Sequence, residues 1–303
     1  TDFGAVLYSL MVPDKDGNLV DVNLGYATPE AYGKETSGFG ATIGRNGNRI
    51  GGAKFTLNGK VYELAPNNNG NNLHSGLDFY QHRMWTVKET TENSITFSMH
   101  SPDGDQGFPG NFDVDVTYTL TDDNELKIDY NGMSDADTIV NMTNHSYFNL
   151  NGHASGSIEG HELWMDADGF TPTDVELIPT GEIASVEGTP MDFRVMKKVG
   201  RDINEDFEDG AAERILGILL VDLGGLNSAG NEFIFNSNLY DLLMLGNGNR
   251  IAVFVQYESR CCLDLAHDPS AERYILKVED TNLIGFAGKN CGFLCELCFV
   301  LRK

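Results

Sequence analysis

The chain has 303 residues, of which 41% are hydrophobic and 22% are charged, so it is long enough to bury a large core. Its 45 acidic and 21 basic residues give a formal charge of −24, which repels nucleic acid and anionic membranes and disfavours a phosphorylated substrate. No apolar run reaches the roughly 18 residues of a membrane-spanning helix. A small neutral ligand is the partner that this composition favours.

The chain begins at Thr1 with neither an initiator methionine nor a basic-then-apolar leader. The opening residues 1–6 resemble the middle of a strand pair, so the sequence predicts a missing upstream strand or a processed start. Residues Ala5–Val12 alternate in part and predict a strand, which ends at the turn cluster 13–17.

Three hairpins follow in chain order. The first joins residues 54–57 and 60–64 through Asn58-Gly59, a pair that supplies the positive φ angles of a type I′ turn. The others pair residues 85–89 with 94–100 and 114–120 with 125–130. Many short strands with hairpin turns, and no alternation of strand and helix, predict an all-β fold, a large antiparallel β-sandwich.

A long stretch rich in glycine and asparagine, residues 37–75, interrupts this rhythm of strands. It contains Asn48-Arg49 and an asparagine run that leads to His74. Loops of this kind on a rigid β scaffold usually carry function. Two glycine patterns in the stretch are not a dinucleotide-binding motif, because no helix follows them.

The block Thr143–Leu150 places His145 among amides, hydroxyls and aromatic rings, directly after the alternating run 137–142. This pattern predicts a strand that delivers an imidazole into a polar pocket with aromatic walls. Imidazole can both give and take a proton near neutral pH, and such a pocket suits a hydroxyl-rich ligand. A buried histidine satisfied by neighbouring amides is the alternative for a lone histidine, but the second histidine block at His74 favours a functional site.

All five cysteines lie late in the chain, at positions 261, 262, 291, 295 and 298. Their odd number and irregular spacing are not a disulfide framework, so a reducing cytoplasm is the expected compartment. No histidine lies near Cys291, Cys295 and Cys298 at ligand spacing, and we expect no metal and no cofactor.

Several separated blocks, in the same order, resemble the aldose 1-epimerases, also called galactose mutarotases. They read GRNGNRIGGAKFTLNGKVYEL at 44–64, NNLHSG at 71–76, GFPGNFDVDVTYTL at 107–120, TNHSYFNLNG at 143–152 and FTPTDVELIPTGEIASVEGTPMDFR at 170–194. The resemblance implies a β-sandwich with a sugar site on the concave face of one sheet. It also implies interconversion of the α and β anomers of free hexoses such as galactose and glucose, without a cofactor.

The resemblance also implies the site residues. His145 is the expected general acid, protonated at rest, and Glu296, in Gly292-Phe293-Leu294-Cys295-Glu296-Leu297, is the expected general base. His74 and Arg49 are expected to bind sugar hydroxyls, with Asn48 in the same layer. A guanidinium offers five fixed donors, which suits two hydroxyls, although a salt bridge to surface carboxylates is the alternative for Arg49.

We expect one β-sandwich domain over residues 1–303, with a clear match to the family over 1–207 and a weak one over 208–303. The family's sugar-binding aspartate has no counterpart near residues 224–233, and the chain stops at Lys303, short of the family's last strand. A monomer or a homodimer is expected. Two alternatives stay open: a sugar-binding protein of this fold without catalysis, and a hexose-6-phosphate 1-epimerase, which the acidic balance disfavours.

Overall fold

The computed structural model describes residues 1–34, 37–122, 125–165, 167–205 and 207 in full, and the backbone of 233–235, 240–246, 249–261, 285–287 and 291–302. The described part is built from strands, and its single α-helix is α1 (Pro29–Tyr32). All of its paired strands are antiparallel. Among these residues, no helix has the length and apolar composition needed to span a bilayer. The expected all-β antiparallel fold is confirmed.

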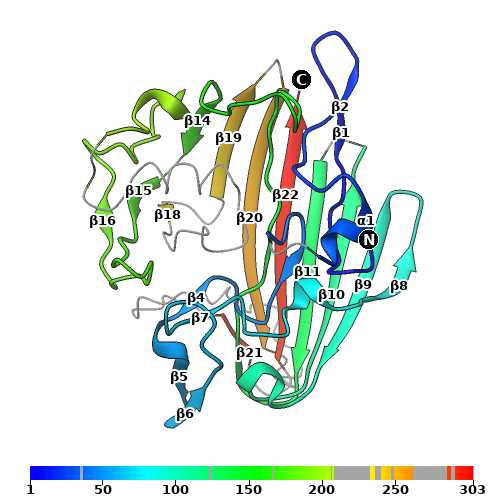
Figure 1. Cartoon of the computed structure of the whole chain (residues 1–303), viewed down its shortest axis with the longest axis vertical. Coiled ribbons are helices and arrows are strands. Elements are labelled where there is room, and N and C mark those ends of the chain that lie inside the picture. Colours follow the sequence, from blue (N-terminus) through cyan, green and yellow to red (C-terminus); the bar gives the residue numbers. More distant parts are fainter. Residues whose placement is uncertain are drawn as a thin grey trace, which may run out of the picture.

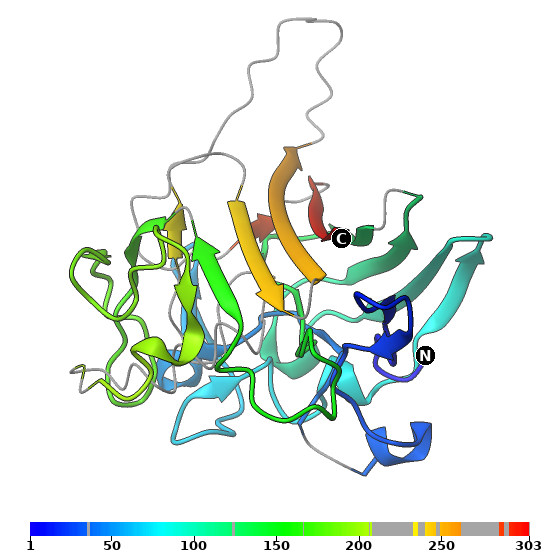
Figure 2. The same cartoon turned by 90° about the horizontal axis from the view of Figure 1, so that it is seen from above.

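A sheet of nine strands forms the centre of the molecule, and Figure 1 shows its strands side by side. Figure 2 shows the same sheet from above, with β14 near one side and β8 at the other. In spatial order the strands are β17 (Lys197–Lys198), β14 (Glu162–Met165), β19 (Tyr240–Gly246), β20 (Asn249–Cys261), β22 (Cys291–Arg302), β11 (Glu125–Ser134), β10 (Phe112–Leu120), β9 (Ser94–Ser101) and β8 (Thr86–Thr90).

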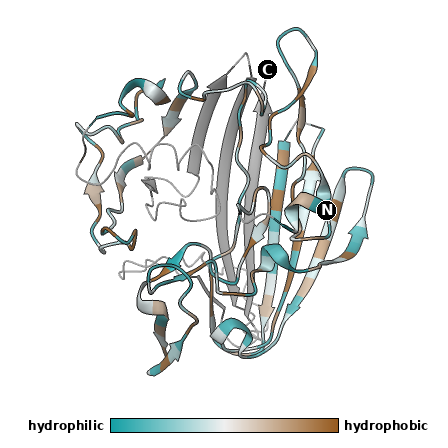
Figure 3. Ribbon diagram, in the orientation of Figure 1, coloured by the Kyte–Doolittle hydropathy of each residue, from teal (hydrophilic) through white to brown (hydrophobic). Residues whose placement is uncertain are grey.

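The alternation of residues along β10 and β11 creates the inner face of this sheet. Phe112, Val114, Val116 and Tyr118 of β10 are buried while the residues between them are more exposed, and the hydropathy alternates in the same way in Figure 3. Successive side chains of a strand point to opposite faces, so this period buries one face of the sheet. On β11 the buried residues Leu126, Ile128 and Tyr130 continue the same core.

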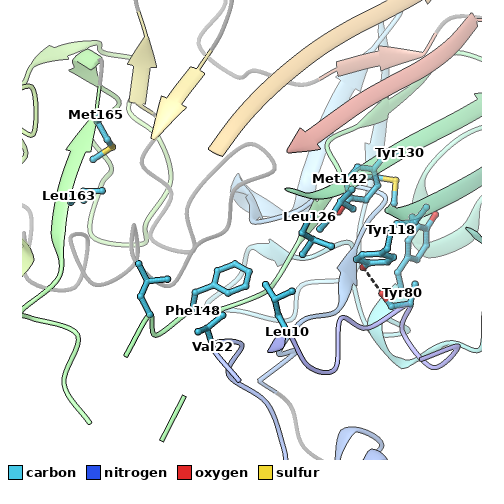
Figure 4. Packing of buried hydrophobic residues seen from close by; sticks show 14 of the residues in the cluster. Leu10, Val22, Tyr80, Tyr118, Leu126, Tyr130, Met142, Phe148, Leu163 and Met165 are labelled. Atoms are coloured by element: carbon cyan, nitrogen blue, oxygen red, sulfur yellow. Dashed lines mark hydrogen bonds between the residues drawn. The ribbon is translucent and has the colours of Figure 1, made fainter. Parts of the chain in front are cut away.

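The main core lies between this face and the segments that cross it. Figure 4 shows Tyr118, Tyr130 and Met142 near one another and Leu163 and Met165 farther along the same cluster. Each fully buried apolar side chain of this size contributes roughly 1.5–3 kcal/mol relative to exposure. The core therefore holds the strand that precedes His145 against the large sheet.

The predicted hairpins are confirmed. β5 (Lys54–Leu57) pairs with β6 (Lys60–Glu63), and the two turn residues Asn58 and Gly59 have φ angles of 52° and 76°. The second and third hairpins are β8 with β9 and β10 with β11. Local turn chemistry was sufficient to find them, since the register of a short hairpin is set by its turn.

The predicted strand at Ala5–Val12 is wrong over most of its length. Only its end belongs to a strand, in β1 (Met11–Pro13), which pairs with β2 (Leu19–Asp21). The residues before it form single long-range bonds instead: the Leu7 amide donates to the Gly40 carbonyl, and the Ala5 carbonyl accepts from the Tyr118 hydroxyl. Tertiary contacts decide the conformation of this segment, and its sequence pattern does not reveal them.

Short strands carry the site segments. β3 (Thr42–Ile43) pairs with β13 (Thr143–Asn144), and β4 (Arg49–Ile50) pairs with β7 (Asn72–Leu73). The remaining elements of the described part are β12 (Thr138–Val140) paired with β21 (Gly285–Ala287), β15 (Ala167–Phe170) with β16 (Ala184–Ser185) and β18 (Phe233–Phe235), and the 3₁₀ turns η1 (Gly51–Ala53), η2 (Tyr80–His82), η3 (Asp105–Gly107) and η4 (Val199–Arg201).

A fully buried arginine ties the segment before β4 to the large sheet. Arg45 Nη1 donates to the carbonyls of Pro109 and Gly110 at 2.7 and 3.2 Å and to Thr138 Oγ1 at 3.0 Å. Its Nη2 donates to Ser101 Oγ at 2.7 Å. Its buried Nε has no hydrogen-bond partner among the described residues. A buried charge is costly unless it is hydrogen-bonded, so this cage of bonds from the two terminal nitrogens holds the chain in place just before Asn48 and Arg49.

Candidate active site

His145 directly follows β13, as the sequence predicted. Its backbone continues the pairing with the β3 region, because its amide donates to the Ala41 carbonyl at 2.8 Å and its carbonyl accepts from the Gly40 amide at 2.9 Å. The side chain is buried, with 8% of its surface exposed. The Nδ1 atom is also buried and has no hydrogen-bond partner among the described residues.

His74 directly follows β7 and lies against His145. The centres of the two imidazole rings are 5.4 Å apart and their planes are nearly perpendicular, at 87°. The structure therefore brings together two histidines that are 71 positions apart in the sequence. The sequence predicted that these two histidines belong to one site, and the described residues place their rings in contact.

Asn48 and Arg49 lie beside His74 because β4 pairs with β7 in a register that places Arg49 opposite Leu73. The Asn48 amide donates to His74 Nδ1 at 2.9 Å, and the His74 amide donates to the Asn48 carbonyl at 2.8 Å. The Asn48 side-chain oxygen accepts from Arg49 Nη1 at 3.3 Å. Four of the five expected site residues thus form one cluster.

Asn68 is a member of this cluster that the sequence reasoning missed. Its side-chain oxygen accepts from Arg49 Nε at 3.0 Å, which directs the guanidinium. Its neighbour Asn67 bonds the Leu73 amide and carbonyl and the Gly76 carbonyl, so it holds the loop closed around β7. The asparagine run was visible in the sequence, but which asparagine meets the arginine depends on the folded loop.

The aromatic wall expected around His145 is present on one side. Tyr147 lies with its ring centre 5.0 Å from that of His145, at an interplanar angle of 61°. Phe39 packs edge-on against Tyr147, with a centre-to-centre distance of 5.3 Å. Because no described group holds Nδ1 of His145, ring packing by Tyr147 and His74 is what fixes the orientation of this imidazole.

Replacement of Tyr147 tests this packing. For the anomer interconversion that the resemblance implies, we expect Tyr147→Leu to lower kcat by about 10-fold with a smaller change in KM, because a reacting group held slightly out of place loses rate more than affinity. Tyr147→Phe keeps the ring and should retain most of the activity. Steady-state kinetics compare the two, with Tyr62→Leu on the β5–β6 hairpin as a control. Equal losses in the leucine and phenylalanine variants would contradict a packing role.

The expectation that His145 is protonated at rest depends on a nearby carboxylate and stays a prediction, because the side chain of Glu296 lies outside the described residues. Burial lowers the pKa of His145 to about 4, and no carboxylate of the described residues is among the groups that shift it. Burial, followed by the charges of His145 and Arg49, lowers the pKa of His74 well below its usual value. The surroundings that the described residues provide favour the neutral form of both rings, because the interior penalises the charged form.

These pKa values predict how stability depends on pH. Burial also lowers the pKa of His161, which accepts a hydrogen bond from the Leu150 amide. Below the unfolded value of 6.5, the unfolded chain binds protons that the folded chain does not, so the free energy of unfolding falls as pH falls from 6.5 towards 4. Urea unfolding at pH 7.5, 6.0 and 4.5 measures this, and greater stability at the lower values would contradict it.

Glu296, the expected base, lies on β22. The backbone register pairs it with Asp129 of β11 on one side and with Gln256 of β20 on the other. Its side chain lies outside the described residues, so its role stays a prediction. The same holds for the side chains of Cys291, Cys295 and Cys298, and for the region 224–232 in which the family's aspartate was sought.

Comparison with known proteins decides the family. The sequence model of the family described as Aldose 1-epimerase matches residues 1–267. The chain belongs to the aldose 1-epimerase family. This match continues beyond residue 207, where the sequence blocks predicted the clear resemblance to end.

Among relatives of this chain, the galactose mutarotase of Sus scrofa is 45% identical over 203 residues, which are 67% of this chain and 59% of the relative. The aldose 1-epimerase of Haemophilus influenzae is 46% identical over 202 residues, 66% of this chain and 58% of the relative. The chain thus spans about 59% of the length of the curated relatives that it matches.

Solved structures agree with the fold. A GalM/aldose epimerase homologue from C. elegans matches with a TM-score of 0.76 and 26% identity, over 99% of this chain and 94% of that one. The galactose 1-epimerase from Lactobacillus acidophilus matches with a TM-score of 0.74 and 23% identity, over 99% of this chain and 89% of that one. The galactose mutarotase type of β-sandwich predicted from the sequence is confirmed.

Proposed function

We propose that this epimerase-family chain interconverts the α and β anomers of free hexoses such as galactose and glucose. The observation that carries the proposal is the pair of perpendicular histidine rings with Arg49 beside them. The cluster offers hydrogen-bond donors and one unpartnered buried imidazole nitrogen, which suits a ligand made of hydroxyl groups. The names of the relatives support the same activity.

The reaction needs two proton movements. The anomeric hydroxyl gives its proton to a base as the bond between the anomeric carbon and the ring oxygen breaks, and the ring oxygen takes a proton from an acid. Rotation beside the new aldehyde carbon and reclosure, with the two roles reversed, give the other anomer. We assign the base to Glu296 and the acid to His145, each contributing roughly 10²–10⁴-fold.

Arg49, His74 and Asn48 are assigned to hold the sugar. Asn68 and the Asn48 side chain orient the Arg49 guanidinium, so that its fixed donors are presented in one geometry. Burial lowers the pKa of Arg49, but a guanidinium keeps its charge at any working pH. A charged donor next to two neutral imidazoles stabilises the negative charge that develops on a sugar oxygen as the ring opens.

Because the pKa of His145 is low, the proposed mechanism requires Glu296 to raise it. With a pKa of about 4, only about one His145 ring in a thousand would be protonated at pH 7, too few for an efficient acid. A carboxylate facing the ring would raise this pKa and restore the acid. We therefore infer that Glu296 acts on His145 as well as on the sugar, and that the two titrate as a pair.

Polarimetry of freshly dissolved α-D-galactose, with and without protein, tests the activity, and its pH dependence tests the pair. A bell-shaped profile of kcat/KM is expected, with the fall at high pH reporting the His145 acid. In Glu296→Gln this fall should move to lower pH, because the carboxylate that raises the His145 pKa is lost. If the high-pH fall of kcat/KM stayed at the same pH, Glu296 would not set the pKa of His145. Sugar binding without acceleration would favour the sugar-binding alternative.

The compartment and the assembly stay predictions. Five cysteines without a disulfide pattern favour the reducing cytoplasm, and a monomer or homodimer remains expected. The formal charge of −24 supports a free, neutral sugar over a sugar phosphate or a nucleic acid.

A further inference from the structure

The two site loops are joined by a backbone lock between Asn48 and His74. In the register of β4 and β7 these residues are the next pair after Arg49 and Leu73, where an antiparallel ladder would exchange two bonds between amides and carbonyls. Only one such bond forms, from the His74 amide to the Asn48 carbonyl at 2.8 Å. The Asn48 amide donates instead to the ring nitrogen Nδ1 of His74, at 2.9 Å.

Unusual backbone angles support this arrangement. Asn48, His74 and Ser75 have φ angles of 58°, 52° and 67°, in the left-handed region that side chains rarely adopt. The Ser75 hydroxyl accepts from the Asn46 amide at 2.6 Å and donates to the Asn46 carbonyl at 2.9 Å, which braces the two loops a second time. Strained residues that cluster at one point are held there by their surroundings.

The lock has a chemical consequence for the His74 ring. A neutral imidazole carries one N–H donor and one acceptor nitrogen, and a backbone amide can only donate. Nδ1 is therefore the acceptor, and the proton sits on Nε2. Resting on the function proposed above, we propose that the Asn48 amide holds His74 as a permanent Nε2–H donor to a sugar oxygen and excludes it from the exchange of protons.

The surroundings of His74 oppose the cationic form as well. Protonation at Nδ1 would break the bond from Asn48 and place two N–H groups against each other. It would also add positive charge beside the Arg49 guanidinium and the His145 ring. Among the described residues no hydrogen bond reaches Nε2, so this donor is available to a ligand. In this proposal the two histidines have different roles. His74 donates a hydrogen bond to a sugar oxygen, and His145 exchanges protons with the sugar.

Nuclear magnetic resonance of the ¹⁵N-labelled chain reads the tautomer directly. Long-range ¹H–¹⁵N correlations of the His74 ring should show the Nε2–H pattern, unchanged from pH 8 to pH 5.5. His74→Gln and His100→Gln identify the two rings by loss of their signals. His100 is an exposed histidine that pairs with Asp113, and its ring signals serve as the control. Exchange of the His74 ring between tautomers, or its protonation near pH 6, would overturn the proposal.

A variant of Asn48 separates its amide from its side chain. Asn48→Gly removes the carboxamide but keeps an amide and tolerates the left-handed φ, so the His74 tautomer should be unchanged. Loss of the Nε2–H pattern in this variant would assign the lock to the side chain and overturn the role of the amide. Because the readout is spectroscopic, it stands apart from turnover: an inactive chain with a fixed tautomer would reject only the proposed function.

Discussion

His145→Ala is expected to lower the rate of anomer interconversion by about 10²–10⁴-fold, which is the contribution of one positioned acid. The loss should fall on kcat, because Arg49 and His74 keep their positions through the pairing of β4 with β7. Polarimetry or NMR exchange of galactose measures it. Sugar binding, followed by isothermal titration, should change by much less than turnover.

A matched control separates catalysis from folding. His100→Ala removes an exposed histidine whose side chain keeps 56% of its surface accessible, and it should leave the rate unchanged. Because His145 is buried, His145→Asn serves as a second variant that fills part of the space and should be as slow as His145→Ala. Activity within a few-fold of the parent chain in a folded His145→Asn would contradict the role of the imidazole.

Arg45→Met is expected to destabilise the fold by about 3–5 kcal/mol, although the residue is not assigned to the reaction. Its removal leaves the carbonyls of Pro109 and Gly110 and the hydroxyls of Thr138 and Ser101 without their donor, all in the interior. Each buried group left unpaired costs about 1–3 kcal/mol. Urea unfolding, followed by the midpoint and slope, measures the change.

The geometry of the cage provides a second test. Arg45→Lys keeps the charge but cannot reproduce the fork of donors, so it should recover little of the loss. Ser101 connects Arg45 to a second ion pair. Its hydroxyl donates to Asp105 Oδ2 at 2.6 Å, and Asp105 forms a salt bridge with Arg83. Arg201→Ala removes an exposed arginine and is the control, and it should change the free energy of unfolding far less than Arg45→Met. A loss below 1 kcal/mol in Arg45→Met would show that the cage is dispensable.

The parts of the fold that could be predicted are those decided by neighbouring residues. The Asn58-Gly59 turn fixes its hairpin because both residues supply positive φ angles on the spot. The segment 5–10 could not be predicted, because its partners, such as Gly40 and Tyr118, lie far away in the sequence. The expectation of one domain over residues 1–303 stays a prediction.

The sequence predicted four residues that the structure brings together, and their roles stay predictions. The family's motifs contain four of the expected residues, His145, His74, Arg49 and Asn48. In the structure these four form one cluster. The burial of His145, which lowers its pKa, could not be predicted because burial is a property of the packed structure. The contact of Asn48 with His74 runs through a backbone amide, which residue type alone does not reveal.

The most direct test of the account is anomer exchange of galactose measured by NMR in four chains: the parent, His145→Ala, Glu296→Gln and the double variant. If the two residues pass protons to the same hemiacetal as one unit, each single variant should lose about 10²-fold or more, and the double variant should lose little beyond the slower single one. Parent-like exchange in Glu296→Gln, or losses that simply multiply in the double variant, would contradict the account.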